Sequence, residues 1–222
     1  LPKRFDTRFF LAVLPQGQES RHDEVETVEH TRDRGLSLTV YRGGRKGSAS
    51  TADLDERSIN ITVEQALAIA RHTEADPAAG LADPERLATW FPELDLWHPS
   101  APDAAAAIEL ALRCEAAALG FDPRINNSEG ASVNAGRSYG IYANSHGFCH
   151  GQQGSRHSLS TTLIAQQDGD MQRDYWYSSA RHPQDLLSAA EVGRVAGERA
   201  VRRLGARRVK TGQYPVLFEA PL

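Results

Sequence analysis

The order of strand-like and helical stretches limits most strongly what this chain of 222 residues can fold into. Three strand-like stretches, at residues 138–145, 158–166 and 171–178, follow one another with no helical pattern between them. The last two are joined by Gln167-Asp168-Gly169-Asp170, a typical hairpin turn. Successive parallel strands need a crossover, usually a helix, so this order predicts an α+β fold with a largely antiparallel sheet.

About three helices are expected to pack on this sheet, because three capping boxes precede helical apolar patterns. The capping pairs are Asp53 with Glu56, Ser100 with Asp103, and Ser188 with Glu191. Gly120 is expected to end the second helix in the left-handed conformation. The residues expected to face the core are Ile59, Val63, Ala66 and Ala70 in the first helix, Ile108, Ala111, Leu112 and Leu119 in the second, and Val192, Val195, Ala196, Ala200 and Leu204 in the third.

Shorter strands are predicted elsewhere in the chain. Residues 36–41 alternate apolar and polar side chains, and Arg42-Gly43-Gly44-Arg45 would turn the chain back into a second strand at residues 46–51. Residues 9–14 and 216–218 are also strand-like. The proline-rich connection at residues 74–102 holds three aromatic side chains that we expect to cover the core from outside, namely Trp90, Phe91 and Trp97.

Composition and charge exclude several classes of protein. A formal net charge of -4 argues against a dedicated nucleic-acid coat, which needs a basic face. No apolar run approaches the ~20 residues of a membrane-spanning helix, so we expect no membrane association. Two cysteines cannot build a disulfide framework, which points to a reducing, cytoplasmic location. The chain does not begin with methionine, and its only methionine is Met171, so we expect a processed or excised piece.

The densest group of side chains that could carry chemistry consists of His146, Cys149, His150 and His157. Imidazole and thiolate are zinc ligands, but structural zinc sites combine two such knuckles, and this chain has one. Strand alternation would also place Cys149 and His150 on opposite faces, so we predict no metal site. The plainer interpretation of Cys149 is a small buried side chain. A self-contained hydrolase in which a nearby histidine activates Cys149 is an alternative.

Basic side chains are concentrated at residues 191–210, where seven of them stand against two glutamates. This run permits a third reading of the chain, as a nucleic-acid-binding module. Much of the run is expected to be the polar face of the third helix, where positive charge near the C-terminus is stabilising. We therefore do not expect nucleic acid as a partner.

Several segments, taken in order along the chain, resemble one protein family. The similarity is strongest at Ile125-Asn126-Asn127-Ser128-Glu129-Gly130, Asn144-Ser145-His146-Gly147 and Arg156-His157-Ser158-Leu159-Ser160. It extends to residues 25–29, 35–41, 45–50, 68–73, 94–99 and 168–175 and to the helix that carries Val192-Gly193. These segments resemble the N-terminal domain of the TldD/PmbA proteins, closer to the PmbA (TldE) branch. The resemblance implies such a domain over residues 24–222, a leader at residues 1–23 that does not match, and a C-terminal domain absent from this chain.

The same resemblance implies a function. TldD/PmbA proteins, also called modulators of DNA gyrase, pair a TldD-like subunit with a PmbA-like one around an enclosed cavity. The chain would be a non-catalytic portion of such a metalloprotease, active in peptide proteolysis or maturation, and would shape the substrate chamber and the subunit interface. Its partners would be a TldD-like subunit and a peptide substrate, with a homodimer as a further alternative. The zinc motif, H-E-x-x-x-H, belongs to the TldD-like subunit, so we expect no catalytic residue, zinc or other cofactor in this chain.

Four residues within the matching segments are expected to contact the peptide or the partner subunit. They are Asn144, His146, Arg156 and His157. A polar strand segment can hydrogen-bond an extended peptide backbone, which is the reason for choosing them. Local strand and turn hydrogen bonds are the alternative role for these side chains.

Overall fold

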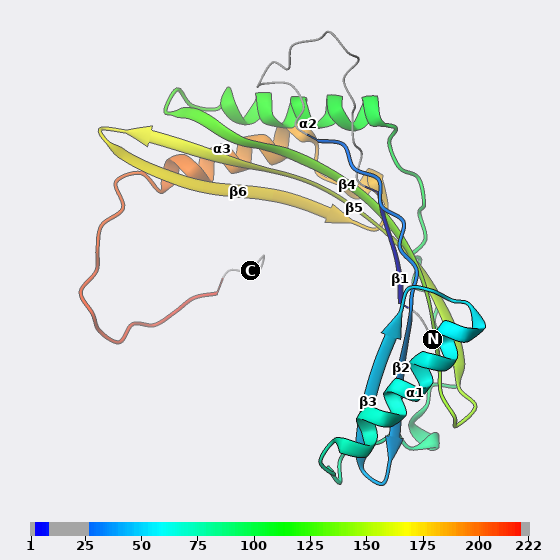
Figure 1. The fold of residues 1–222 in the computed structure, drawn as a ribbon. Coiled ribbons are helices and arrows are strands. Elements are labelled where there is room, and N and C mark those ends of the chain that lie inside the picture. Colours follow the sequence, from blue (N-terminus) through cyan, green and yellow to red (C-terminus); the bar gives the residue numbers. More distant parts are fainter. Residues whose placement is uncertain (1–2, 9–26, 219–222) are drawn as a thin grey trace.

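The computed structural model describes residues 3–8 and 27–218 (Figure 1). Its larger sheet has the order β1 (Lys3–Arg8), β4 (Ile125–Ala143), β5 (Cys149–Gln167) and β6 (Asp170–Ala180), and neighbouring strands are antiparallel. A smaller sheet pairs β2 (Leu36–Arg42) with β3 (Arg45–Thr51). The helices are α1 (Glu56–His72), α2 (Ala104–Leu119) and α3 (Ala189–Arg202), with short 3₁₀ helices η1 (Pro84–Arg86) and η2 (Pro183–Asp185). The predicted α+β fold is confirmed, and none of the described helices combines the length and apolar character that crossing a bilayer requires.

The β2–β3 hairpin and α1 pack together as a small unit. The hairpin forms where the sequence predicts it, and Gly43 and Gly44 take the positive φ angles, 58° and 73°, that its turn requires. The helix lies so close to β3 that a Cβ on Gly47 would overlap the carbonyl oxygen of Ala66. The buried residues of α1 are Thr62, Ala66 and Ala70, whereas Ile59 and Val63, predicted for the core, are only half-buried.

Two of the three helices begin later than their predicted capping pairs. Asp55 caps α1 by accepting a hydrogen bond from Ser58 N–H at 2.6 Å, and Asp103 caps α2 by accepting one from Ala106 N–H at 2.8 Å. The caps predicted at Asp53 and Ser100 are therefore wrong, because a carboxylate closer to the first turn takes the role in each case. Ser188 caps α3 as predicted.

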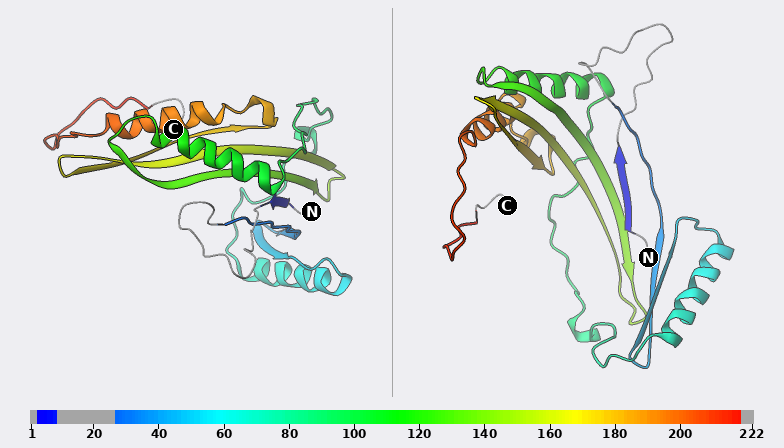
Figure 2. Two further views of the ribbon diagram at one scale, coloured as in Figure 1. Left: turned by 90° about the horizontal axis from the view of Figure 1, so that it is seen from above. Right: turned by 60° about the vertical axis from the view of Figure 1, so that its left-hand side comes forward.

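Both α2 and α3 cover the same face of the larger sheet (Figures 1 and 2). The two helices meet at Gly193, where a Cβ would overlap the carbonyl oxygen of Cys114 and lie 2.8 Å from Ala118 N. Leu159 and Leu163 of β5 form the core beneath them. In α3 the predicted core residues Val192, Ala196 and Ala200 are buried, and Val195 and Leu204 are half-buried.

The predicted core face of α2 is wrong in part. Ile108 and Ala111 are half-buried, whereas Leu112 and Leu119 are 38% and 39% exposed. Alanines occur on every side of this helix, so its sequence shows no distinct apolar stripe from which the buried face could be predicted. The buried face is the one with small side chains, because α2 approaches α3 closely there. Gly120 ends the helix with φ −76° rather than in the left-handed conformation, and its N–H donates to Ala116 O. The buried residues of α2 are Ala107, Cys114 and Ala118.

Two strands are much longer than predicted. β4 begins at Ile125 instead of near residue 138, and β5 begins at Cys149 instead of residue 158. The added residues are mostly Gly, Ser, Asn and Gln, which are poor strand formers by themselves and are held here by cross-strand pairing. β6 ends at Ala180, opposite His157, so β4 and β5 continue past it as an arm. The arm reaches toward the β2–β3 hairpin (Figure 1).

The remaining short-strand and aromatic predictions fail or lie outside the description. Residues 216–218 form no strand, and Leu217 is 95% exposed. Trp90 is 74% exposed, so it does not cover the core as predicted, whereas Trp97 is half-buried. Phe91 instead stacks on His150, with ring centroids 3.5 Å apart. The strand predicted at residues 9–14 lies outside the described residues.

Candidate functional site

The face of the larger sheet opposite α2 and α3 carries none of the described helices (Figures 1 and 2). Alternation along β5 separates the two faces, because odd-numbered residues at 155–165 are buried and even-numbered residues at 158–164 are half-buried. On β6 the odd-numbered residues are the exposed ones. This open face comprises Ser158, Ser160, Thr162 and Ile164 of β5 with Arg173, Tyr175, Tyr177 and Ser179 of β6.

Hydroxyl groups dominate the open face. The strand register places Ser160 opposite Tyr177, and Thr162 opposite Tyr175. The rings of Tyr175 and Tyr177 are stacked, with centroids 6.4 Å apart. Hydroxyls both donate and accept hydrogen bonds, and tyrosine adds a flat apolar ring. The open face can therefore hydrogen-bond an uncharged extended chain and pack against its side chains.

An ion pair crosses one end of the open face. Arg173 Nη2 on β6 lies 2.7 Å from Glu129 Oε2 on β4, and the pair reaches over Ile164 of the intervening strand. Both side chains are substantially exposed, so the pair contributes at most ~1 kcal/mol to stability. Its main effect is to neutralise the only charged side chain among the open-face residues named above.

Ser155 holds the end of the 74–102 connection against β5. Its backbone N–H donates to Leu96 O at 2.8 Å, and its buried hydroxyl accepts from His98 N–H at 2.7 Å. The hydroxyl also lies 3.2 Å from Leu96 O and 3.0 Å from Arg181 O, and its one proton can serve either carbonyl. His157 Nε2 lies 3.0 Å from His98 O. Residues 96–98 are therefore held parallel to β5, in the place that β6 leaves free.

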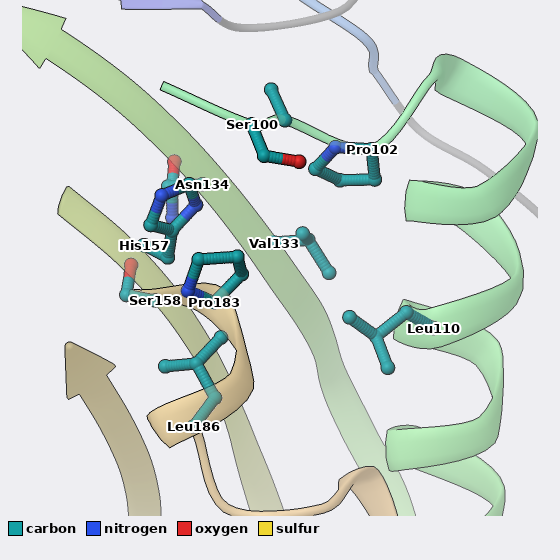
Figure 3. A pocket seen from close by; sticks show the side chains of 10 residues that line it. Ser100, Pro102, Leu110, Val133, Asn134, His157, Ser158, Pro183 and Leu186 are labelled. Carbon is teal, nitrogen blue, oxygen red and sulfur yellow. The ribbon is translucent and has the colours of Figure 1, made fainter. Parts of the chain in front are cut away.

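A pocket of about 290 Å³ lies beside this anchor, between β4, β5, α2 and η2 (Figure 3). His157 and Leu110 stand at its two ends with Val133 between them, and the proline rings of Pro102 and Pro183 form two of its sides. The complete lining is Ser100, Ala101, Pro102, Leu110, Val133, Asn134, His157, Ser158, Pro183 and Leu186.

The four predicted contact residues fall into two separate groups. Asn144 and His146 lie in the turn that closes the arm, where His146 N–H donates to Asn144 Oδ1 at 3.0 Å. Arg156 and His157 lie at the other end of the arm, ~26 Å from the start of β5 at the usual strand rise. Arg156 is exposed and its Nε donates to Ser179 Oγ at 3.0 Å, whereas His157 is only 3% exposed. Local hydrogen bonds thus occur at these residues, and the contact role stays a prediction.

The described residues do not converge on a zinc site. They contain no group of three or more His, Cys, Asp or Glu side chains that could hold a metal ion. The candidate ligands lie at different points along the arm, namely His146, Cys149, His150 and His157. This arrangement does not fit the zinc ion that the family resemblance implies. Their positions follow from the strand pairing, which the isolated motif did not reveal.

Cys149 is not positioned as a nucleophile. Its side chain is exposed, so the expectation that it is buried is wrong. Within the described part of the chain, no histidine lies within hydrogen-bonding distance of its thiol, and a cysteine hydrolase needs that base. The buried cysteine is Cys114, and burial raises the pKa of its thiol to about 11, which keeps it protonated near neutral pH.

Much of the basic run in α3 is paired with acidic groups. Arg194 lies 2.8 Å from Glu191 and 3.1 Å from Glu198. Arg199 and Arg203 both lie 3.5 Å from the buried carboxylate of Asp174. These pairs neutralise the run, which weakens the interpretation as a nucleic-acid surface. The exposed basic residues that follow or flank them are Arg202, Arg207, Arg208 and Lys210.

The sequence did not reveal the pocket or the open face. The pocket collects residues from four distant parts of the chain, and of these only His157 and Ser158 belong to a family-like segment that the sequence analysis singled out. The open-face tyrosines do carry a local signal, because Tyr175 and Tyr177 are two residues apart in a predicted strand and must share a face. What the sequence does not show is that this face stays free of helices.

Comparisons with known proteins identify the family of this chain. Residues 97–204 match the PmbA/TldA metallopeptidase central domain, and residues 19–70 match the PmbA/TldA metallopeptidase domain 1. Metalloprotease PmbA of Escherichia coli O157:H7 is 47% identical over 199 residues, which are 90% of this chain and 44% of that protein. The metalloprotease PmbA homolog of Haemophilus influenzae is 42% identical over the same shares. The chain thus spans less than half the length of these relatives, and the single domain expected over residues 24–222 stays a prediction.

Solved structures agree with this assignment. A protein from Bacteroides thetaiotaomicron that carries the name modulator of DNA gyrase superposes with a TM-score of 0.78 at 28% identity, over 96% of this chain and 47% of that one. TldE from Thermococcus kodakarensis superposes with a TM-score of 0.59 over 90% of this chain and 42% of that one. At 12% identity this second likeness shows a shared fold alone. The family matches and the PmbA relatives together establish that the chain belongs to the PmbA/TldD family, in its PmbA-like branch.

Proposed function

We propose that this chain is a non-catalytic portion of a PmbA/TldD-type metalloprotease, and that its open sheet face forms part of the wall of a peptide-admitting chamber. The observation that carries the proposal is the placement of α2 and α3 on one side of the sheet (Figure 1). The other side is left with hydroxyl-bearing side chains and two partly exposed tyrosines. A face that another folded domain covers permanently is usually more apolar.

The chemistry of the open face suits peptides of varied sequence. The hydroxyls of Ser160, Thr162 and Tyr175 can bond to backbone amides, which every peptide has. Tyr175 and Tyr177 offer flat rings that pack against many kinds of side chain. Arg173 is neutralised by Glu129, so the face does not select strongly for charge. These properties support a wall that admits many peptides without a fixed sequence.

The tip of the β4–β5 arm is the part we assign to the subunit interface. Aromatic rings gather there, with Phe91 5.9 Å from Phe148 and Tyr142 5.7 Å from Phe148. Tyr142 is 53% exposed, and His146 is exposed in the adjacent turn. Exposed aromatic residues are enriched at protein interfaces. In this proposal Asn144 and His146 contact a TldD-like subunit, while Arg156 lies close to the open face.

The metal of the complex is assigned to the partner. The described histidines and cysteines of this chain do not converge on one point, so we propose that a TldD-like subunit holds the catalytic zinc. When bound, that ion would supply an activated water and polarise the peptide carbonyl. The present residues would bind and orient the peptide.

Co-expression tests the proposal. The full-length gene product that contains this chain would be produced with and without a TldD-like protein from the same genome. We expect the two proteins to co-purify, and we expect peptide cleavage only when both are present. Failure to associate under any salt condition, or cleavage by the PmbA-like protein alone, would contradict the assignment.

A matched pair of variants distinguishes the proposed peptide-binding role of the open face from the proposed role of the chain in subunit association. Tyr175→Ser with Tyr177→Ser removes the rings of the open face and should lower peptide cleavage while the subunits still co-purify. Tyr214→Ser removes an exposed tyrosine outside the sheet and should leave cleavage unchanged. Equal cleavage by the double variant and the control would refute the wall role without affecting the partner claim.

A further inference from the structure

Two arginines lie at the end of the open face where β6 stops. Arg156 is an even-numbered residue of β5, so its side chain lies on the same side of the sheet as the open face. Ala180, the last residue of β6, is opposite His157, and the next residue along the chain is Arg181. A Cβ on Gly154, another even-numbered residue of β5, would lie 3.3 Å from Nη1 of Arg181. Both side chains therefore reach the open-face side of this end of the sheet.

Neither arginine is balanced by an acidic side chain. Arg156 Nε donates to Ser179 Oγ at 3.0 Å, and Arg181 Nη1 donates to Ser155 O at 3.0 Å. Both acceptors are uncharged, and among the described residues neither guanidinium group forms an ion pair with a carboxylate. Like charges at neighbouring positions of adjacent segments repel. A bound anion would relieve this repulsion.

The rest of the open face carries no unbalanced charge. Arg173 is paired with Glu129, and the other open-face residues are Ser, Thr, Ile or Tyr. The β4 residues beside them in the register, Ser132 and Asn134, are uncharged too. A ligand that covers the face thus meets neutral hydrogen-bonding groups along most of its length and excess positive charge at one end. This difference between the two ends gives the face a direction.

The Arg156 side chain is suited to a carboxylate. A guanidinium group can donate two parallel N–H bonds to the two oxygens of a carboxylate. The bond from Nε to Ser179 holds the Arg156 side chain in place, and it leaves both Nη atoms to a ligand. Arg156 is also exposed, so a ligand can reach it. A side chain that is already oriented loses less freedom on binding.

We infer that Arg156, with Arg181 beside it, binds a carboxylate of the peptide that lies on the open face. The inference rests on the proposed peptide-binding role of that face. The carboxylate is the C-terminus of the peptide or an acidic side chain near it, and its position sets the direction in which the peptide lies. From Arg156 to Ile164 the strand rises by ~26 Å, so a peptide extended along β5 covers the face with about eight residues.

Three peptides that differ only in charge test the carboxylate requirement. Each has about eight alanine and serine residues and an uncharged fluorescent dye at its N-terminus. The first ends in a free carboxylate, the second in a carboxamide, and the third in a glutamate whose own C-terminus is a carboxamide. Fluorescence anisotropy would measure their binding to the full-length gene product that contains this chain, without a TldD-like subunit.

We expect at least one carboxylate peptide to bind about five- to tenfold more tightly than the neutral carboxamide at low salt. The comparison of the first and third peptides shows whether the C-terminus or the side chain supplies the carboxylate. The advantage should shrink at about 0.5 M salt, because the site is exposed and its charges are screened. Equal affinity of all three peptides at low salt would overturn the inference.

Two variants of equal net charge locate the effect. Arg156→Gln removes the positive charge but keeps an amide that can donate to Ser179, so the advantage of the carboxylate peptides should fall below about twofold. Arg113→Gln makes the same change on α2, which covers the other side of the sheet, and should keep the full advantage. An undiminished advantage in Arg156→Gln, or an equal loss in both variants, would refute the assignment.

Failure of the proposed function gives a different result from failure of this inference. If the open face does not bind peptides, Tyr175→Ser with Tyr177→Ser will bind all three peptides as the parent protein does. If only the carboxylate site is wrong, the parent protein will bind the three peptides equally, and the double tyrosine variant will weaken all three alike.

Discussion

Substitution of Gly193 by alanine should destabilise the protein, although alanine is the better helix former. In an unconstrained helix interior, Gly→Ala stabilises by about 1 kcal/mol. At Gly193 the new Cβ would overlap the carbonyl oxygen of Cys114 and lie 2.8 Å from Ala118 N, well inside the 3.4–4 Å of an ordinary contact. Both obstructing atoms belong to the backbone of α2, so no side-chain rotation can relieve the overlap.

The magnitude follows from these opposing effects. Forcing α2 and α3 apart costs about 3 kcal/mol, the upper end for an overpacked core, because rigid backbone stands in the way. Subtracting the propensity gain leaves a net loss of about 2 kcal/mol in the free energy of unfolding. For a chain of this length, such a loss lowers Tm by about 4–8 °C.

Gly197→Ala is the matched control in the same helix. A Cβ at Gly197 would meet side-chain atoms of Phe121 and Ile125 at 2.9–3.0 Å, which is a milder overlap than the one with the Cys114 carbonyl oxygen at Gly193. Ile125 Cδ1 can rotate away, and Phe121 Cβ can move with its loop backbone. We expect its stability to remain within about 1 kcal/mol of the parent protein, since the propensity gain offsets the contact. Urea unfolding followed by far-UV circular dichroism measures both variants. If Gly193→Ala is as stable as the parent, or if the two variants lose the same stability, the proposed close contact between α2 and α3 is wrong.

Three further predictions concern single groups. Ser155→Ala should lower the free energy of unfolding by about 2 kcal/mol and speed proteolysis within residues 91–98, because the partners of this buried hydroxyl lose their hydrogen bonds; unchanged urea midpoints would contradict this. In the native protein at pH 8, a thiol reagent should modify the exposed Cys149 and spare Cys114, whose raised pKa and burial suppress the thiolate; modification of two thiols before unfolding would count against it. The hydrogen bond from Arg124 lowers the pKa of Asp122 to about 2, so its stabilising effect is present above its ordinary pKa of 3.8 and is lost as pH falls toward 2. Asp122→Asn should therefore flatten the fall in stability between these pH values, as followed by urea midpoints, and an unaltered slope would refute the pairing.

Local sequence patterns predicted the parts of the fold that local interactions determine. The β2–β3 hairpin requires glycines at positive φ, and α3 combines a Ser188 cap with a clear apolar stripe. Both elements can therefore be predicted from the sequence. The β5 strand shows the opposite case, because its first residues are rich in Gly and Gln and become a strand only by pairing with β4. Pairing between residues distant in sequence is invisible to a pattern within one segment.

The candidate sites were harder to predict from the sequence than the fold, for the same reason. Asn144 and Arg156 were chosen from motifs, and the structure places them at opposite ends of the arm. The pocket depends on where α2 and η2 come to lie against β5, which no motif encodes. His157 stood out as a residue type, but its burial and its bond to His98 O followed only from the tertiary arrangement.

The connection at residues 74–102 differs in its tolerance of inserted residues from one half to the other. Phe91 stacks on His150, Leu96 O accepts from Ser155, and His98 O lies against His157, so each contact joins residues 59 positions apart. An added residue anywhere in 91–98 would shift the register of at least one of these contacts and break it. The start of the connection is fixed in another way, because Asp76 N–H donates to Gly44 O at 2.8 Å. Residues 87–90 carry no such match to the arm, and a surface loop there accommodates extra length at small entropic cost. Affinity tags, labels or reporter peptides therefore belong between η1 and Trp90, where the arm and the pocket would remain undisturbed.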